Sequence, residues 1–329
     1  MKTLVLKINE KSPEKDKIDR AAKIINNSGL VVFPTETIYG LGASAFNVEA
    51  VKKIFKAKGR PNDNPLIVHI ADKDEVYLLA SKIPEVAWKL MDKFWPGPLS
   101  IVLKKKEIVS DEVTAGLKTV AIRMPQNKIA LELIRRAGPI AAPSANISTK
   151  PSGTSVKHVI QDFNGKVDCI ISSNDSEIGL ESTVISLATN PPLLLRPGKI
   201  TLEQLREFIP NIRVHEAVFG RSFKEKPASP GMKYKHYAPK AEVIIVEGAK
   251  DKIKPRIREL IQKYKIGNEK FYVVVIENPK KLARDLFKIF RICDGMGYKH
   301  IIVPAVDEKG IGLAVMNRLR KAASKTIIV

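Results

Sequence analysis

Residues 58–70 of the chain read Lys58-Gly59-Arg60-Pro61-Asn62-Asp63-Asn64-Pro65-Leu66-Ile67-Val68-His69-Ile70. Glycine readily adopts the left-handed conformation that ends a helix, so Gly59 predicts a helix end at this point. The basic pair Lys58 and Arg60 is then expected at the helix end and in the loop that follows. The apolar run 66–70 predicts a strand that carries His69. A basic pair, a polar loop and an apolar strand in this order indicate a binding site rather than an ordinary surface loop.

The sequence around this stretch alternates helical faces with short apolar runs. Asn47 can cap a helix in which Val51, Ile54 and Phe55 share one face at helical spacing. Further helices are predicted at 86–94, 130–137 and 201–209, and strands at 30–33, 99–103, 120–124, 140–142, 167–171, 183–187 and 193–195. Because several strands follow one another after short gaps, we expect a twisted α/β sheet of mixed strand directions.

The chain has 329 residues, long enough that two domains are expected. The periodic pattern fails at 211–239, and a segment of that length is usually a functional loop or a linker. Strands are predicted again at 243–246, 271–276 and 300–303, with helices at 253–264, 282–292 and 313–323. This alternation predicts right-handed crossovers and a small parallel, Rossmann-like sheet. We therefore predict a larger domain at 1–210, a linker at 211–239 and a smaller domain at 240–329.

The net charge of +21 predicts attraction to polyanions such as nucleotides, nucleic acids or acidic membranes. Because the basic residues are spread along the chain, many of them can equally be solvated surface residues. Cys169 and Cys293 are the only cysteines, so neither a disulfide framework nor a cysteine metal site is expected. Residues 1–19 are too charged for a signal peptide, and no apolar run reaches the ~18 residues of a membrane span. We expect a soluble, cytoplasmic protein without membrane contact.

Two common nucleotide-binding motifs can be set aside. Residues 40–45 fit a loose G-x-G-x-x-A, but a dinucleotide fingerprint needs that turn directly after a strand and an acidic residue after the next one. Here 34–37 intervene, and the next strand carries His69 instead. The sequence contains no G-x-x-x-x-G-K-[ST], Ser-His-Asp order or H-E-x-x-H. The chain therefore suggests an enzyme that positions reactants and stabilises charge, without a protein nucleophile.

Several polar residues are candidates for binding phosphates, although each has an ordinary structural explanation. Lys58 supplies a point charge and Arg60 a planar fork, which suit a polyphosphate, but cations at a helix end also complement the helix dipole. Ser144 and Asn146 point the same way in an extended chain and could bind phosphate oxygens or a magnesium-bound water. A turn at the end of a strand explains them as well. His69 can be a purely structural histidine.

Seven segments of the first 210 residues carry an ordered set of motifs. They are 33–41, 58–70, 94–99, 120–125, 142–146, 181–183 and 195–198. With its Lys-x-Arg pair at 58–60 and its Ser-x-Asn pair at 144–146, the set resembles the YrdC-like family, the threonylcarbamoyl-AMP synthases. Segments 229–239 and 316–322 continue the resemblance. They mark the longer, two-domain branch of the family, so the resemblance covers essentially the whole chain.

The resemblance implies a twisted YrdC-like domain with a deep basic concave face, a linker and a small Rossmann-like C-terminal domain. It also implies a reaction in which L-threonine, bicarbonate or CO₂ and ATP give L-threonylcarbamoyladenylate and pyrophosphate. The product would pass to the machinery that transfers the threonylcarbamoyl group to an adenosine of tRNA, next to the anticodon. The enzyme would be a nucleotidyltransferase that uses Mg²⁺ with its ATP.

The resemblance also implies roles for individual residues. Those assigned to ATP, its phosphates or its magnesium are Lys58, Arg60, Asn62, Thr119, Ser144, Asn146, Ser152, Arg196 and His236. Those assigned to L-threonine are Thr35, His69, Arg123 and Ser182, and those expected to be catalytic are Lys58, Arg60, Ser144 and Asn146. Arg123 is expected to bind the threonine carboxylate. Tyr234, His236 and Tyr237 are expected to close over the site as a lid, and the metal ligands stay open.

The chain departs from the family pattern at two loops. Gln126-Asn127 stand where the family often has His-Pro, and Ser148 is followed by Thr149 where the family usually has glycine. Both positions lie at loop edges. They leave the local loop shape open, and with it the role of Ser152.

An alternative function is that of a non-catalytic RNA-binding protein, which would bind tRNA on the basic concave face. The net charge favours it, but the sequence has no aromatic RNA platform, and aromatic residues make up only 6% of the chain. A carbamoyl-transfer domain for another product is a third reading. The larger proteins of that kind carry zinc and acylphosphatase-like domains, which this sequence lacks. The role of the C-terminal domain, direct RNA binding and the oligomeric state stay open.

Overall fold

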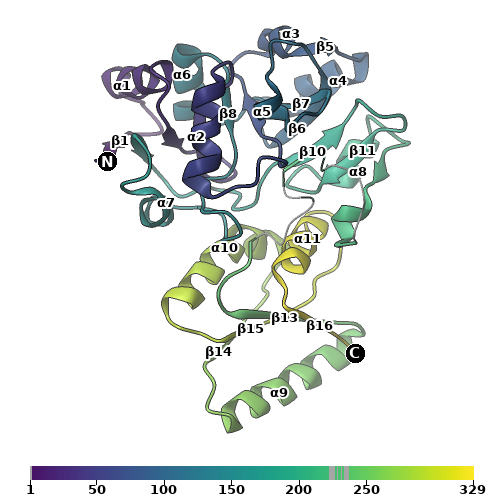
Figure 1. The fold of residues 1–329 in the computed structure, drawn as a ribbon. Coiled ribbons are helices and arrows are strands. Elements are labelled where there is room, and N and C mark those ends of the chain that lie inside the picture. The colour runs from purple at the N-terminus through teal and green to yellow at the C-terminus, as the bar shows by residue number, and fades with distance from the viewer. Residues whose placement is uncertain (1, 222–226, 228, 231, 233–236) are drawn as a thin grey trace.

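The computed structural model describes residues 2–221, 227, 229, 230, 232 and 237–329, and it shows a large and a small α/β domain (Figure 1). The large domain contains β1 (Leu4–Lys7), α1 (Lys15–Asn26), β2 (Val31–Phe33), β3 (Gly40–Ser44), α2 (Val48–Lys58), β4 (Ile67–His69), η1 (Lys73–Glu75), α3 (Val76–Leu79), β5 (Ala80–Lys82), α4 (Glu85–Phe94), β6 (Leu99–Lys105), α5 (Asp111–Thr114), β7 (Thr119–Arg123), α6 (Lys128–Ala137), β8 (Ile140–Ala142), α7 (Val156–Phe163), β9 (Cys169–Ser172), β10 (Thr183–Ser186), β11 (Leu193–Arg196), α8 (Leu202–Arg206), β12 (Arg213–Val214) and η2 (Glu216–Phe219). The small domain contains β13 (Glu242–Glu247), α9 (Lys250–Ile266), β14 (Phe271–Val273), α10 (Pro279–Gly295), β15 (His300–Pro304), α11 (Gly312–Ala322) and β16 (Lys325–Ile328).

The large sheet has twelve strands in the order β1-β9-β2-β3-β8-β4-β7-β6-β10-β11-β12, with β5 paired to β6. Parallel pairs such as β4·β7 and antiparallel pairs such as β6·β7 are mixed, which confirms the predicted mixed sheet. The loose G-x-G-x-x-A segment forms β3, an antiparallel partner of β2. It is a strand and not a phosphate-binding turn, so setting the dinucleotide motif aside agrees with the structure.

Helix α2 forms as its sequence predicts. The Asn47 side chain accepts a hydrogen bond from the Ala50 amide at 2.9 Å and so caps the first turn. Val51 and Ile54 are fully buried on the apolar face. Gly59 follows the last residue with φ 59° and ψ 40°, the left-handed conformation expected there. The helix therefore ends where Lys58 turns toward the sheet.

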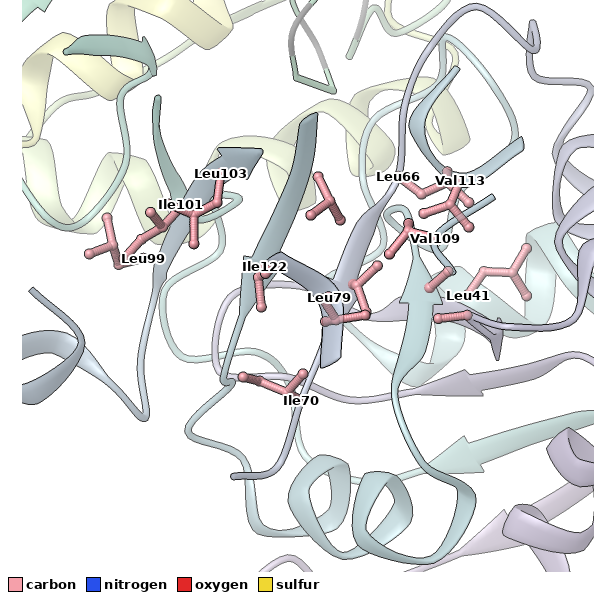
Figure 2. Packing of buried hydrophobic residues seen from close by; sticks show 14 of the residues in the cluster. Leu41, Leu66, Ile70, Leu79, Leu99, Ile101, Leu103, Val109, Val113 and Ile122 are labelled. Atoms are coloured by element: carbon pink, nitrogen blue, oxygen red, sulfur yellow. The ribbon is translucent and has the colours of Figure 1, made fainter. Parts of the chain in front are cut away.

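Two apolar layers cover the large sheet. Residues of β6 and β7, among them Ile101 and Ile122, pack with α2 and α4 in the main cluster, part of which Figure 2 shows. α1 and α6 form the second cluster with β2 and β9, through residues such as Ile18 and Leu133. Because side chains alternate along a strand, Ala121 faces away from Ile122 and packs in a separate small cluster with Ile67 and Val102. Among the described residues, no helix is both long and apolar enough to cross a membrane.

The small sheet has the order β14-β15-β13-β16, and its pairings are all parallel, which confirms the predicted Rossmann-like arrangement. α10 and α11 cover the face toward the large domain, and α9 covers the opposite face (Figure 1). In segment 211–239, which follows the large domain in the chain, β12 pairs with β11 of the large sheet, and Val218 of η2 is buried. The start of segment 211–239 thus packs on the large domain, and the domain boundaries at 210 and 239 stay predictions.

Close contacts join the domains outside the pocket as well, among them the two that follow. Arg291 on α10 donates to Asp162 Oδ2 on α7 at 2.6 Å, and both side chains are buried. Gly179 has a φ of 75°, and a Cβ atom there would lie 2.1 Å from the carbonyl oxygen of Arg284 on α10. Only glycine fits at this position, because a side chain would be strained and would also collide with the helix backbone.

We expect alanine substitutions at two left-handed glycines to differ in cost. At Gly59 a Cβ atom meets nothing within 4 Å, so Gly59→Ala should cost only backbone strain of about 1 kcal/mol, which lowers the melting temperature by about 2–4 °C. At Gly179 the collision with α10 should add about 1–3 kcal/mol. Thermal unfolding of the two variants measures the difference. Equal losses would contradict the tight domain contact.

Candidate functional site

A polar pocket lies at the strand ends of the large sheet, where β4, β7, β8 and β11 end and where β3 and β10 begin. Residues assigned from the sequence that line it are Thr35, Lys58, Arg60, His69, Arg123, Ser144, Asn146, Ser182, Arg196 and Tyr237. Other polar or backbone groups in the lining come from Thr37, Tyr39, Gly40, Ser148, Thr149, Glu181 and Pro230. The fold therefore brings segments from distant parts of the chain to one place.

Lys58 is buried at the end of α2, with 2% of its surface exposed. Its Nζ atom donates to the carbonyl oxygens of Ser144, at 2.6 Å, and of Asn146. Burial and the nearby Arg60 guanidinium hold the pKa of Lys58 well below its ordinary value. The two carbonyls compensate part of the burial cost, and an anionic ligand would favour the charged form of Lys58 further.

Arg60 shapes the loop that follows the helix. Its guanidinium donates to the carbonyl oxygens of Asn64, at 3.1 and 3.2 Å, and of Pro65, at 3.0 Å. These bonds close the polar loop on itself, and the planar group still lines the pocket.

Ser144 and Asn146 lie side by side, as their spacing suggested. Ser144 pairs with Gly40 through an isolated bridge at the start of β3. The Ser144 hydroxyl donates to Asn146 Oδ1 at 2.6 Å, and Asn146 Nδ2 donates to the carbonyls of Ile147 and Lys150 at 2.9 Å. The amide oxygen and the hydroxyl therefore form a compact pair of hard oxygen atoms next to the Lys58 ammonium.

His69 and Arg123 are paired residues of the parallel strands β4 and β7. The Arg123 guanidinium binds Glu36 Oε1 at 2.6 Å, the Thr37 hydroxyl at 2.9 Å and the Gly97 carbonyl at 3.2 Å. Of its five N–H donors, two remain by this count, one on each terminal nitrogen. They suit a second carboxylate, one supplied by a ligand.

Burial, helped by the charge of Arg123, lowers the pKa of His69 to about 3. The imidazole is therefore neutral at physiological pH. Its Nδ1 atom is buried and makes no regular hydrogen bond within the described part of the chain. A buried polar atom without such a bond, in the wall of a pocket, is the kind of group that a ligand satisfies.

Ser182 and Arg196 form the opposite wall. Arg196 donates to the Ser182 carbonyl and hydroxyl at 3.0 Å and to the Pro230 carbonyl at 3.3 Å. The Ser182 hydroxyl also shares a 2.8 Å hydrogen bond with Ser100. Burial lowers the pKa of Arg196 to about 10, so the group stays charged at neutral pH.

Glu181 is the one carboxylate among the described residues that line the pocket. Its Oε1 atom accepts from the Ser152 hydroxyl at 2.6 Å, and its Oε2 atom accepts from Arg318 Nε of α11 at 2.8 Å. Burial raises the pKa of Glu181, but Arg318, Arg196 and the Ser152 hydrogen bond outweigh burial and leave the pKa below its ordinary value. The pocket thus holds one ionised carboxylate.

Some assigned residues lie away from the pocket lining. Asn62 is exposed in the loop after α2, and Thr119 lies at the opposite end of β7 from Arg123, four residues away. Ser152 is buried behind the wall, where it bonds to Glu181. Tyr234 and His236 lie outside the described residues. The roles of these residues, like those of the lining residues, stay predictions.

Sequence reasoning gave no function to Glu181, Thr37 and Arg318. Glu181 stands in the matched segment 181–183, but no role was assigned to it there. Thr37 and Arg318 also fall inside matched segments. The available signal was their position inside segments that match the family motifs. Only the fold shows that Glu181 and Arg318, far apart in the chain, meet.

The chain matches known proteins along its whole length. Residues 23–198 match the Sua5/YciO/YrdC family model, described as telomere recombination, and residues 200–324 match the C-terminal domain of threonylcarbamoyl-AMP synthase. The chain is 51% identical to threonylcarbamoyl-AMP synthase of Pyrococcus abyssi, covering 99% of both chains. It is 45% identical to that of Bacillus subtilis, covering 97% of this chain and 96% of the relative.

A solved structure is similar to both domains together. The structure is P. abyssi Sua5 complexed with L-threonine, which is 50% identical to this chain. The superposition has a TM-score of 0.96 and covers 99% of this chain and 100% of the other. The predicted fold of two α/β domains is confirmed.

The low pKa of His69 predicts how stability depends on pH. Between about pH 6.5 and pH 3, the unfolded chain binds a proton at this residue and the folded chain does not. Stability should therefore fall as pH decreases, by up to about 1.4 kcal/mol per pH unit from His69. His158, whose pKa burial lowers to about 4, acts in the same direction. Denaturant unfolding from pH 7 to pH 4 should show a shallower pH dependence for His69→Gln than for the wild type. Equal slopes would contradict a neutral His69.

Proposed function

The chain belongs to the Sua5/YciO/YrdC family in its two-domain threonylcarbamoyl-AMP synthase form, and we propose on this basis how its pocket performs the synthase reaction. The reaction predicted from the motifs joins L-threonine, bicarbonate or CO₂ and ATP into L-threonylcarbamoyladenylate, with release of pyrophosphate. The observation that carries the residue roles is the gathering of Lys58, Arg60, Arg123 and Arg196 in one pocket. Four cations suit a polyphosphate and an amino-acid carboxylate bound together.

We assign the phosphate side of the pocket to Lys58, Arg60 and Arg196. Lys58 and Arg60 lie at the end of α2, and Arg196 stands on the other wall, beside Ser182. Ser144 and Asn146 add oxygen and N–H groups next to Lys58. Each of these groups is already held by backbone carbonyls or neighbouring side chains, so the site is preorganised for an anion.

We assign the amino-acid side to the walls around Arg123. The two remaining N–H donors of Arg123 would bind the threonine carboxylate as a fork. The neutral ring of His69 can accept a hydrogen bond from the substrate without adding a positive charge. Thr35 and Ser182 supply further hydroxyls to the lining of the pocket. P. abyssi Sua5, the similar structure, was solved with L-threonine, which supports this proposal.

The chemistry needs positioning and charge neutralisation. The threonine amine would add to CO₂ and lose a proton, which gives a carbamate. A carbamate oxygen would then attack the α-phosphorus of ATP, and the bond to the β-phosphate oxygen would break, so that pyrophosphate leaves. Neither step requires a side-chain nucleophile, and the pocket offers none of the common nucleophile–base pairs. Cations fixed around both reactants stabilise the charge that shifts to pyrophosphate.

Magnesium fits this site as a companion of ATP. Among the described residues no group of three or more His, Cys, Asp or Glu could hold a metal ion, so a cage built from protein side chains alone is not expected there. Mg²⁺ commonly takes most of its oxygen ligands from phosphates and water. The hard oxygens of Ser144 and Asn146 suit contact with such a hydrated ion. When bound, the ion would neutralise phosphate charge.

The linker is assigned to a lid. Tyr237 is buried in the pocket wall and has a φ of 67°, which an aromatic residue seldom adopts. Tyr234 and His236 are assigned to the same lid from the sequence alone. A closed lid would exclude water from the mixed anhydride product. We also propose that the product passes to the tRNA threonylcarbamoyl-transfer machinery and that the protein works in the cytoplasm.

We expect pyrophosphate release from ATP and bicarbonate to depend on L-threonine. The physical reason is that the carbamate, which attacks the α-phosphate, forms only from the amino acid. The assay compares release with and without threonine, in the absence of RNA, with serine as a competitor. No release with intact ATP binding would contradict the synthase. Tight RNA binding with a steep salt dependence would then favour the RNA-binding alternative.

We expect Lys58→Ala to lower threonine-dependent pyrophosphate release by roughly 100-fold or more, because a preorganised cation at the phosphates is removed. Lys56→Ala is the matched control, since Lys56 lies on the same helix but is exposed. Circular dichroism checks that both variants fold. A folded Lys58→Ala enzyme with activity near that of the control would rule out the phosphate role of Lys58.

A further inference from the structure

The side chain of Arg318 brings the small domain into contact with the wall of the pocket. Arg318 on α11 is completely buried, with an exposed fraction of 0%. It crosses the domain boundary to bind Glu181 Oε2 through Nε at 2.8 Å. A completely buried arginine is costly unless its charge is paired and its N–H groups are bonded, so this contact is a specific arrangement.

The arginine is fixed on several sides. Its Nη1 atom donates to the Pro197 carbonyl and to Asn317 Oδ1, each at 2.9 Å. Asn317 in turn donates to the Val218 carbonyl of η2 at 2.7 Å. The guanidinium also lies over the Tyr237 ring, 5.7 Å from its centre, within the range of a cation–π contact. Arg318 is therefore held rigidly and touches two residues of the pocket wall, Glu181 and Tyr237.

The charges around Glu181 explain what this contact does. Without Arg318, the buried carboxylate would keep its negative charge only by pairing with another nearby cation. The buried Lys321 of α11 also interacts electrostatically with Glu181, but it does not line the pocket. Arg196 and Lys58 both interact electrostatically with Glu181 and line the same pocket. These are the cations proposed to bind the phosphates. A Glu181 carboxylate that turned to them would neutralise the phosphate site, and Arg318 prevents this by occupying Oε2.

We propose that Arg318 is a positioning residue of the nucleotide site, through which the C-terminal domain completes the pocket. It holds Glu181 away from the phosphate-binding cations and supports the Tyr237 ring from behind. The proposal rests on the proposed synthase function. It gives the C-terminal domain a direct part in substrate binding, which a domain that only stabilises the chain would not have.

The structure offers a matched control for this idea. Arg291 on α10 also crosses the domain boundary, and it also pairs with a buried carboxylate, that of Asp162, at 2.6 Å. Neither residue lines the pocket. Both act electrostatically on Lys58, so the Arg291 variant also controls for a change of charge felt by that lysine. A loss of domain contact alone should therefore affect Arg291 and Arg318 variants alike. An effect through Glu181 should appear only in the Arg318 variants.

The test compares Arg318→Met and Arg291→Met in the full chain, by melting temperature and by the kinetics of threonine-dependent pyrophosphate release. We expect both variants to lose thermal stability. Only Arg318→Met should raise the KM for ATP, by about tenfold or more, with a smaller change in kcat. Equal KM values for ATP in the two variants would overturn the proposal. If Arg318→Met does not fold, Arg318→Lys is used, which keeps a charge that can pair with Glu181 but loses the guanidinium fork. It should show a smaller rise in the KM for ATP that Arg291→Lys does not share, and equal KM values in these two variants would overturn the proposal.

A double variant separates positioning from packing. Glu181→Gln removes the carboxylate that Arg318→Met leaves unpaired, so Arg318→Met/Glu181→Gln should recover most of the KM for ATP. A double variant as impaired as Arg318→Met would show that the arginine acts by packing and would overturn the proposal. Threonine-dependent pyrophosphate release by the wild-type enzyme is measured first. Wild-type enzyme without threonine-dependent release contradicts the synthase itself, whereas an active wild type with an unchanged Arg318→Met contradicts only this inference.

Discussion

Burying positive charge is the constraint that organises this molecule. The pocket contains Lys58, Arg60, Arg123 and Arg196, and the fold gives each of them backbone carbonyls to bind. A carbonyl offers a partial negative charge, so these bonds lower the cost of burial without cancelling the charge. The cations therefore remain attractive to an anion. A pocket of this kind is held ready for phosphate and carboxylate groups, and binding them relieves the remaining electrostatic cost.

This constraint explains why the surrounding chain is irregular. Carbonyl groups inside a sheet are already used by neighbouring strands, so those that face the cations come from strand ends and turns. Lys58 uses the turn after β8, and Arg60 uses its own loop at 64–65. The mixed strand order brings these ends to one edge of the large sheet. The loops carry the chemistry, and the apolar layers packed on the sheet hold them in place.

The two domains are joined through the same kind of interaction. Arg291 and Arg318 each carry a positive charge from the small domain to a buried carboxylate of the large one. Such pairs contribute little net stability compared with apolar packing, but they fix one arrangement because a displaced partner leaves a buried charge unpaired. The position of the small domain is thus coupled to the ionised state of Glu181. This coupling gives a physical reason for the closeness of the second domain to the site.

Much of the fold follows from local sequence patterns. The cap at Asn47, the left-handed exit at Gly59 and the capping box at Thr201 with Gln204 are determined by residues close in the chain, and the structure has all three. The alternation of strands and helices after Pro239 likewise determined the small parallel sheet. The motifs in short segments of the sequence were sufficient to indicate the family. Strands such as β1 and β16, short and partly exposed, carry too little periodicity to be predicted.

The contacts within the site could not be predicted from local sequence patterns. The types of its residues could be read from the motifs, because Lys58, Ser144 and Arg123 stand in short segments with a clear composition. The partners of these residues were decided by tertiary structure alone. Lys58 binds the Ser144 carbonyl, Arg123 binds Glu36, and Arg318 binds Glu181, which is 137 residues away in the sequence. Capping and periodicity act within a few residues, whereas the pairing of buried charges depends on which distant segments the folded chain brings within hydrogen-bond distance.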